Sequence, residues 1–243
     1  MRLDHDSNAD RPGGLAQTMA MLFALGFPTL ATYLYFIALA GQPAMQPAYA
    51  LTKVLQFAFP VLWVVAVQRK AIRLARPTLQ GVATGAVFGA VVVAAMLALY
   101  YGYLKTSPLF SDAPAKVAEK IADFGVETWL EFIALAAFIA LLHSLMEEYY
   151  WRWFVFGQLQ KSLPLAWAIG WSSLGFMAHH VVVVGLYLKG YGAATWFFSF
   201  CVAVGGAAWA WLYYKSGRLY GPWVSHLLVD LGLMWIGYDL WRA

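Results

Sequence analysis

The sequence predicts an all-α protein, a polytopic membrane helix bundle of about seven transmembrane helices, with a range of six to eight. Of the 243 residues, 62% are hydrophobic and 12% are charged, and the mean hydropathy is +0.64. Soluble domains carry roughly twice that share of charged residues. Apolar stretches of about 20 residues, the length of helix that crosses a bilayer, recur from Leu15 to Leu240.

Seven spans are expected, separated by short breaks that are rich in polar residues, Gly and Pro. They cover residues 15–40, 48–68, 80–104, 126–157, 163–188, 192–214 and 220–241. The polar tail before them, residues 1–14, lacks the basic region and short apolar core of a cleavable signal peptide. We therefore expect a disordered tail followed by a retained helix.

One break is expected to contain a short amphipathic helix near residues 112–124. Asp112 suits its N-cap and Pro114 its first turn, while Val117, Ile121 and Phe124 form one apolar face. Such a helix is expected in the membrane interface beside the bundle. The chain thus divides into the tail, an N-terminal group of spans with this helix at 15–125, and a second group of spans at 126–241.

Lysine and arginine in the breaks set the expected orientation. If all seven spans cross, nine of these residues fall on one side and five on the other, which favours a cytoplasmic N-terminus. The same clustering at span ends accounts for the net charge of +4, so no nucleic-acid partner is expected. Cys201 is the only cysteine, which excludes an internal disulfide.

Ionisable side chains inside the spans concentrate in the fourth, fifth and seventh of them. A charged group there costs about 2.5–3.5 kcal/mol on insertion scales and is usually functional. The first three spans offer only Lys53, which we expect to extend toward the interface. The set in the second half comprises His143, Glu147, Glu148, Arg152, His179, His180, His226 and Asp230.

Helical spacing separates the two adjacent acids of the fourth span. Glu148 and Arg152 are four residues apart, so we expect them to pair on one face of the helix. Glu147 is rotated by about 100° from Glu148 and is free to act elsewhere. His143 lies one turn before Glu147 on the same face, as a supporting partner or as a packing residue.

The histidines of the fifth and seventh spans follow the same spacing rule. His180 shares a face with Phe176, whereas His179 points away and is expected to pack, and Asp230 shares a face with His226. A carboxylate and a histidine that meet in a dry site can activate water, and a second histidine can supply a donor for an oxyanion. The constellation predicts hydrolysis of an amide inside the membrane.

Three sequence motifs contain these residues. "EEYYWR" fits the pattern E-E-x-x-x-R, "FMAHH" fits F-x-x-x-H and "HLLVD" fits H-x-x-x-[N/D]. In this order, each on an expected span, they resemble the CPBP family of intramembrane proteases, which are related to the type II CAAX prenyl endopeptidase. The resemblance covers about 126–241 as a catalytic core, and the first three spans match only in being hydrophobic.

The resemblance implies a role for each motif residue. Glu147 would activate water together with His180, and His226 would stabilise the oxyanion with Asp230. The CAAX-cleaving members have Asn where this chain has Asp230, and an ionised Asp donates no hydrogen bond. Asp230 would therefore be protonated or would orient His226. The residues expected to support the site are Glu148, Arg152, Phe176 and His143.

The resemblance also implies a glutamate-dependent mechanism, so no cofactor is expected. A zinc site is the alternative, because His180, His226 and one of Glu147 or Asp230 could supply three ligands. The H-E-x-x-H spacing of many zinc proteases is missing from the chain.

Two other functions are open to the same residues. A non-proteolytic membrane scaffold or regulator of this fold would not need all of them at once. A proton-coupled transporter often shows inverted repeats, and the sequence shows none. For the protease, the expected partners are the lipid bilayer and a membrane-anchored protein or peptide. Its identity, its prenylation and the oligomeric state of the enzyme do not follow from the sequence.

Overall fold

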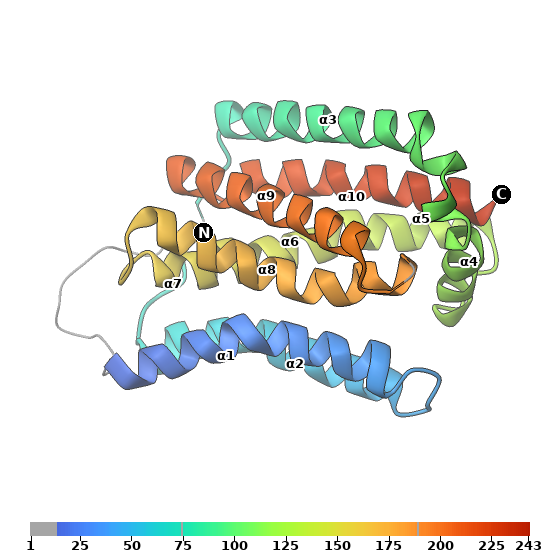
Figure 1. Cartoon of the computed structure of the whole chain (residues 1–243). Helices are drawn as coiled ribbons and strands as arrows, with labels where there is room; N and C mark the ends of the chain where they lie inside the picture. Colours follow the sequence, from blue (N-terminus) through green and yellow to red (C-terminus); the bar gives the residue numbers. More distant parts are fainter. Residues whose placement is uncertain (1–13, 74, 189) are drawn as a thin grey trace.

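The computed structural model describes residues 14–73, 75–188 and 190–243, and this part of the chain is a bundle of long helices without a β-strand. The long helices run roughly along one direction, and α4 lies across it at one end (Figure 1). The expected disordered tail at 1–14 lies, apart from Gly14, outside the described residues.

Six long α-helices and one composite helix form the bundle. The composite helix consists of α5 (Trp129–Ala137), α6 (Ser144–Glu148) and α7 (Gly157–Leu159), joined by the π-helical segments η5 (Phe138–His143) and η6 (Tyr149–Phe156). The others are α1 (Gly14–Tyr33), α2 (Met45–Leu62), α3 (Leu79–Gly102), α8 (Leu165–Tyr187), α9 (Ala193–Ser216) and α10 (Tyr220–Trp241). The shorter elements are η1 (Leu34–Ala38), η2 (Trp63–Val67), η3 (Leu104–Thr106), η4 (Pro108–Phe110) and α4 (Ala113–Asp123).

Six helical stretches of the described chain are long and apolar enough to cross a membrane. Their bounds are Gly14–Ala38, Met45–Val67, Leu79–Thr106, Trp129–Leu159, Leu165–Tyr187 and Ala193–Ser216. This number lies within the predicted range, and the predicted all-α membrane fold is confirmed. The seventh expected span is the helix α10, which begins and ends where the sequence predicts but is not one of these six.

Helices α3 and α10 pack closely because small residues line their contact. Gly81, Gly85 and Gly89 of α3 follow one another at intervals of four residues, the spacing that lets membrane helices approach closely. A Cβ atom added at Gly85 would overlap the carbonyl oxygen of Gly221, and one added at Gly89 would lie 2.9 Å from that of Ser225. The contact therefore fixes α10, which carries the third motif, against the rest of the bundle.

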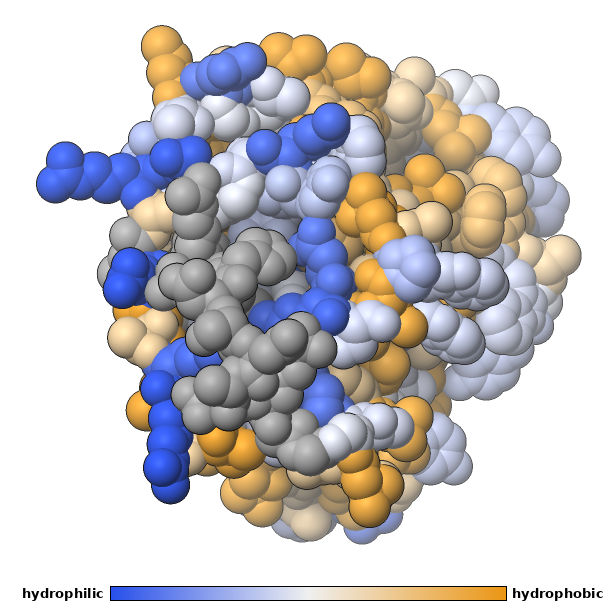
Figure 2. Space-filling model, turned by 90° about the vertical axis from the view of Figure 1, so that its left-hand side faces the viewer, coloured by the Kyte–Doolittle hydropathy of each residue, from blue (hydrophilic) through white to orange (hydrophobic). Residues whose placement is uncertain are grey.

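The bundle has a polar end where the loops after α2, α7 and α9 meet. Figure 2 looks onto this end, where hydrophilic side chains gather and are bordered by apolar ones. Gly217, with φ at 61°, ends α9 in the left-handed conformation that favours glycine. Arg218 Nε donates to the carbonyl oxygen of Arg76 at 2.9 Å, which joins two of these loops.

The expected amphipathic helix is present as α4, with Pro114 in its first turn. Asp112 precedes the helix, but its side chain makes no capping hydrogen bond, so this detail of the prediction is wrong. Its backbone already has helical dihedral angles (φ −95°, ψ −8°), whereas a capping side chain usually starts from an extended residue. The carboxylate accepts a hydrogen bond from the Ser111 hydroxyl at 3.0 Å instead.

Candidate active site

The E-E-x-x-x-R motif lies where the composite helix changes from α to π geometry. Glu147 and Glu148 end α6, and Arg152 lies in the π-helical segment η6. Such wider turns are rare and are frequent at functional sites. All residues from Tyr150 to Phe156 are buried, so the helix that presents the two acids is enclosed by its neighbours.

Two groups bind one oxygen atom of the Glu148 carboxylate. Its Oε1 atom lies 2.8 Å from Nδ1 of His226 in α10 and 3.1 Å from Nη1 of Arg152. The predicted ion pair between Glu148 and Arg152 is therefore present, and it is almost completely buried. Because the Nδ1–H group of His226 donates to this carboxylate, its Nε2 atom is the one that faces the remaining site.

The Arg152 guanidinium is also enclosed by two aromatic faces. Its central carbon lies 4.4 Å from the ring centroid of Phe176 and 4.9 Å from that of Trp209. Gly206 of α9 makes room for it, since a Cβ atom there would come within 3.4 Å of Nη2. Aromatic faces attract a desolvated cation, so Phe176 supports the ion pair with Glu148.

Glu147 faces three imidazoles. Its Oε1 atom lies 3.5 Å from Nε2 of His143 and 3.4 Å from Nε2 of His179, and its Oε2 atom lies 3.6 Å from Nε2 of His226. These separations exceed an ordinary hydrogen bond, although the side chain is buried. Unlike Glu148, this carboxylate has no contact of ordinary hydrogen-bond length with these three rings.

The adjacent histidines of α8 both reach this carboxylate. Nδ1 of His180 lies 2.8 Å from the carbonyl oxygen of Phe176, which leaves Nε2 as an acceptor when the neutral ring donates through Nδ1. His179, for which the sequence predicts a packing role, contacts Glu147 and stacks on Trp151 at 5.7 Å. The two histidine rings are only 4.1 Å apart, so the rotation between neighbours on a helix does not separate them.

Asp230 and Trp209 flank the ring of His226. Oδ1 of Asp230 lies 3.7 Å from Nε2 of His226, and its buried Oδ2 atom has no hydrogen-bond partner among the described groups. The Trp209 indole stacks on His226 at 4.1 Å and donates from Nε1 to the Ser225 hydroxyl at 2.9 Å. Trp209 lies on the sixth expected span, and no spacing rule distinguishes it there from the other tryptophans.

A metal ion would find its ligands in Glu147, His179 and His180. One ligand atom from each lies within 4.8 Å of the other two. A carboxylate with two imidazoles is a donor set of catalytic zinc, with bonds of about 2.0–2.2 Å. This group differs from the ligands considered from the sequence because it contains His179 in place of His226. In such a site, Glu147 would be a ligand rather than a base.

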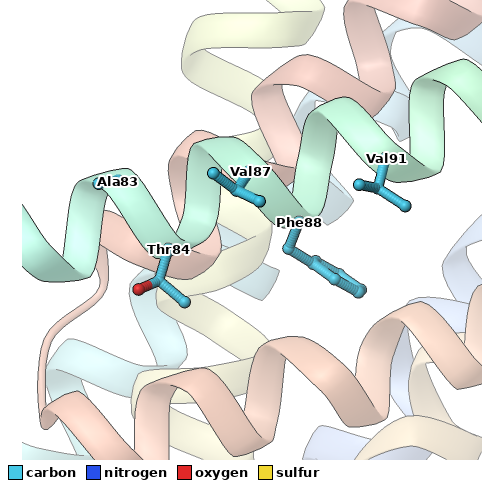
Figure 3. Close-up of a pocket in the computed structure, with 5 residues that line it drawn as sticks. All are labelled: Ala83, Thr84, Val87, Phe88 and Val91. Atoms are coloured by element: carbon cyan, nitrogen blue, oxygen red, sulfur yellow. The ribbon is translucent and has the colours of Figure 1, made fainter.

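A hollow on α3 is lined by residues that do not belong to this site. Its one polar lining side chain is Thr84, whose hydroxyl donates to a backbone carbonyl of the same helix at 2.9 Å. Its lining residues, Ala83, Thr84, Val87, Phe88 and Val91, carry no ionisable group (Figure 3). We interpret it as part of the lipid-facing surface.

Comparison with known proteins identifies the segment that carries the motifs. Residues 129–232 match the family described as Rce1-like, type II CAAX prenyl endopeptidase Rce1-like. No curated protein and no solved structure matches the chain. The matched segment contains all three motifs, and the apolar helices indicate a multi-pass membrane protein. The predicted resemblance is thereby confirmed: residues 129–232 form an Rce1-like domain.

Proposed function

We propose that this protein is an intramembrane endopeptidase that hydrolyses a peptide bond of a membrane-associated protein or peptide. The observation that carries the proposal is the contrast between two adjacent acids. Glu148 is bound at 2.8 and 3.1 Å, whereas Glu147 faces three imidazole nitrogens at 3.4–3.6 Å. A scaffold needs a bound acid for packing, but it does not need a second buried carboxylate that three imidazole nitrogens face without a short hydrogen bond.

In the proposed mechanism, one water molecule binds between Glu147 and His180. A ring nitrogen of His180 and a carboxylate oxygen of Glu147 lie within 4.8 Å, a gap that one water spans with two hydrogen bonds of about 2.8 Å each. His180 accepts one hydrogen bond from the water and orients it. Glu147 takes the other proton as the water oxygen attacks the scissile carbonyl carbon.

The attack places negative charge on the former carbonyl oxygen, and we assign its stabilisation to His226. The Nε2 atom of this ring is directed toward the site and donates a hydrogen bond to the oxyanion when the ring is protonated. Asp230 either holds that protonated ring or, when protonated itself, donates a second hydrogen bond. The C–N bond then breaks as Glu147 returns its proton to the leaving nitrogen, and the products are a carboxylic acid and an amine.

The proposal includes no cofactor and a cytoplasmic N-terminus. Its zinc-dependent alternative uses Glu147, His179 and His180 as ligands. The orientation rests on the lysines and arginines of the loops and helix ends that meet at the hydrophilic end of the bundle (Figure 2). The described members of that group are Arg69, Lys70, Arg73, Arg76, Lys161, Lys215 and Arg218.

The test is proteolysis of a library of membrane-anchored peptides by the purified full-length protein. We expect the wild type to cleave a subset of the peptides, a metal chelator to leave the rate unchanged, and the Glu147→Gln variant to cleave none. Activity lost with the chelator and restored by zinc would establish a metalloenzyme. A folded wild type that cleaves no peptide would favour the scaffold, and proton-dependent uptake into vesicles would indicate a transporter.

A further inference from the structure

Lys53 lies inside a membrane-spanning helix rather than at its end. It follows Met45, the first residue of α2, by eight positions, or about 12 Å at 1.5 Å per residue. Its Nζ atom lies 3.3 Å from Oε1 of the buried Gln56. The sequence predicts that this side chain extends toward the interface, but the structure places the half-buried side chain beside aromatic faces and an amide oxygen, which attract the cation.

Three aromatic rings surround the Lys53 amine. The centroids of Tyr35, Tyr49 and Phe57 lie 5.7–5.9 Å from Nζ. Neither these rings nor the Gln56 amide carries a negative charge. A cation within a span costs about 2.5–3.5 kcal/mol on insertion scales, and Arg152, the other cation in a span near the site, has a carboxylate at 3.1 Å. The Lys53 amine therefore has capacity for an anionic partner.

Helix α2 packs against the segment that follows the proposed catalytic carboxylate. The same helix contacts the π-helical segment that follows the acids, because the Tyr149 hydroxyl donates to the carbonyl oxygen of Phe57 at 3.0 Å. An anion bound by Lys53 would thus lie near the groups proposed to cleave the peptide bond.

We propose that Lys53, assisted by Gln56, binds a carboxylate of the peptide substrate and thereby positions the scissile bond at Glu147. The inference rests on the proposed protease function and concerns a helix outside the matched segment 129–232. An ammonium group has three donors, and with one directed to Gln56 two remain for the carboxylate. A lipid phosphate is the less suitable occupant, because headgroups lie at the ends of spans and this amine lies within one.

The first test measures cleavage of one membrane-anchored peptide in two forms, with its carboxylates free and with them converted to carboxamides. Neutral phosphatidylcholine nanodiscs carry the full-length protein. We expect Lys53→Met to raise KM for the charged form by about 10–100-fold, which corresponds to one hydrogen bond to a charged group. KM for the neutral form should not change, and Lys53→Arg should restore part of the preference. Lys215→Met is the matched control, because this exposed lysine lies in the last turn of α9, away from the proposed site.

The second test measures binding of the same two peptides with a ketomethylene group in place of the scissile amide. We expect the wild type to bind the charged form more tightly and Lys53→Met to bind both forms equally. Equal binding of the two forms by the wild type, or binding of neither, would overturn the inference. If phosphatidylglycerol binds in a Lys53-dependent way and the two peptides bind equally, the site binds a lipid and the inference is overturned. Lys53-dependent binding without cleavage would sustain the inference and contradict the protease function.

Discussion

Glu148 shares a buried site with a cation and a histidine, and a neutral side chain there would leave the Arg152 guanidinium unpaired. Breaking a buried ion pair by removing one partner costs about 3–5 kcal/mol. We therefore expect Glu148→Gln to lower the thermal unfolding midpoint of the detergent-solubilised protein strongly. Glu147→Gln is the matched control on the neighbouring residue, and its longer contacts of 3.4–3.6 Å predict a smaller change. Equal losses of stability in the two variants would contradict the different roles of the two acids.

The role of Asp230 can be tested with Asn, the residue that the family resemblance implies at this position. Asn would place an amide donor beside Nε2 of His226, so Asp230→Asn should retain most of the cleavage rate. Asp230→Ala removes the polar group and should lose about 10²–10³-fold in kcat, the usual effect of deleting one oxyanion donor. An Asn variant as inactive as the Ala variant would show that the negative charge of Asp230 is what the reaction requires.

At the level of single residues, the sequence predicts pairs on one helix better than contacts between helices. The Glu148–Arg152 pair follows from spacing alone, and the structure contains it. The contact of His179 with Glu147 and the stacking of Trp209 on His226 join different helices. No regular spacing in one chain encodes such contacts, because they depend on how the helices pack.

The close contact of α3 with α10 predicts that a single methyl group disrupts the bundle. A Cβ atom at Gly85 would meet the backbone of Gly221, which cannot move aside as a flexible side chain can. Gly85→Ala should therefore destabilise the protein by about 1–3 kcal/mol, as overpacking generally does. Thermal unfolding measures this against Gly102→Ala on the same helix, where the added carbon would meet no described atom within 4 Å apart from its chain neighbours and the nearby helix backbone. An equal midpoint for the two variants would contradict the close contact.

Helix bounds were predictable, whereas their internal geometry was not. Hydropathy and the polar breaks place the span expected at 192–214 close to the observed Ala193–Ser216. The π-helical segments on both sides of α6 leave no hydropathy signal, because apolar residues occupy α and π turns alike. The glycines at 81, 85 and 89 did carry a readable signal, since four-residue spacing of small residues indicates helix packing in membranes.

At the scale of the molecule, the Rce1-like domain supplies the motif residues and the N-terminal helices complete their surroundings. α1 and α2 lie beside the helices of that domain (Figure 1), and Phe57 of α2, outside the matched segment, accepts a hydrogen bond from the Tyr149 hydroxyl next to the two acids. Composition alone predicts a membrane bundle, because 62% hydrophobic residues leave few other folds. Composition does not predict where the proposed anion-binding lysine lies, because its position depends on how the first two helices pack against the others.

The most direct test of the central claim is the cleavage rate of one membrane-anchored peptide by folded Glu147→Gln protein. The mechanism assigns proton transfer to this carboxylate, and loss of a general base typically costs 10²–10⁴-fold. We predict a rate at least ~10³-fold below that of the wild type, with the thermal midpoint and peptide binding nearly unchanged. A folded variant that cleaves the peptide at the wild-type rate would show that Glu147 is not the catalytic base.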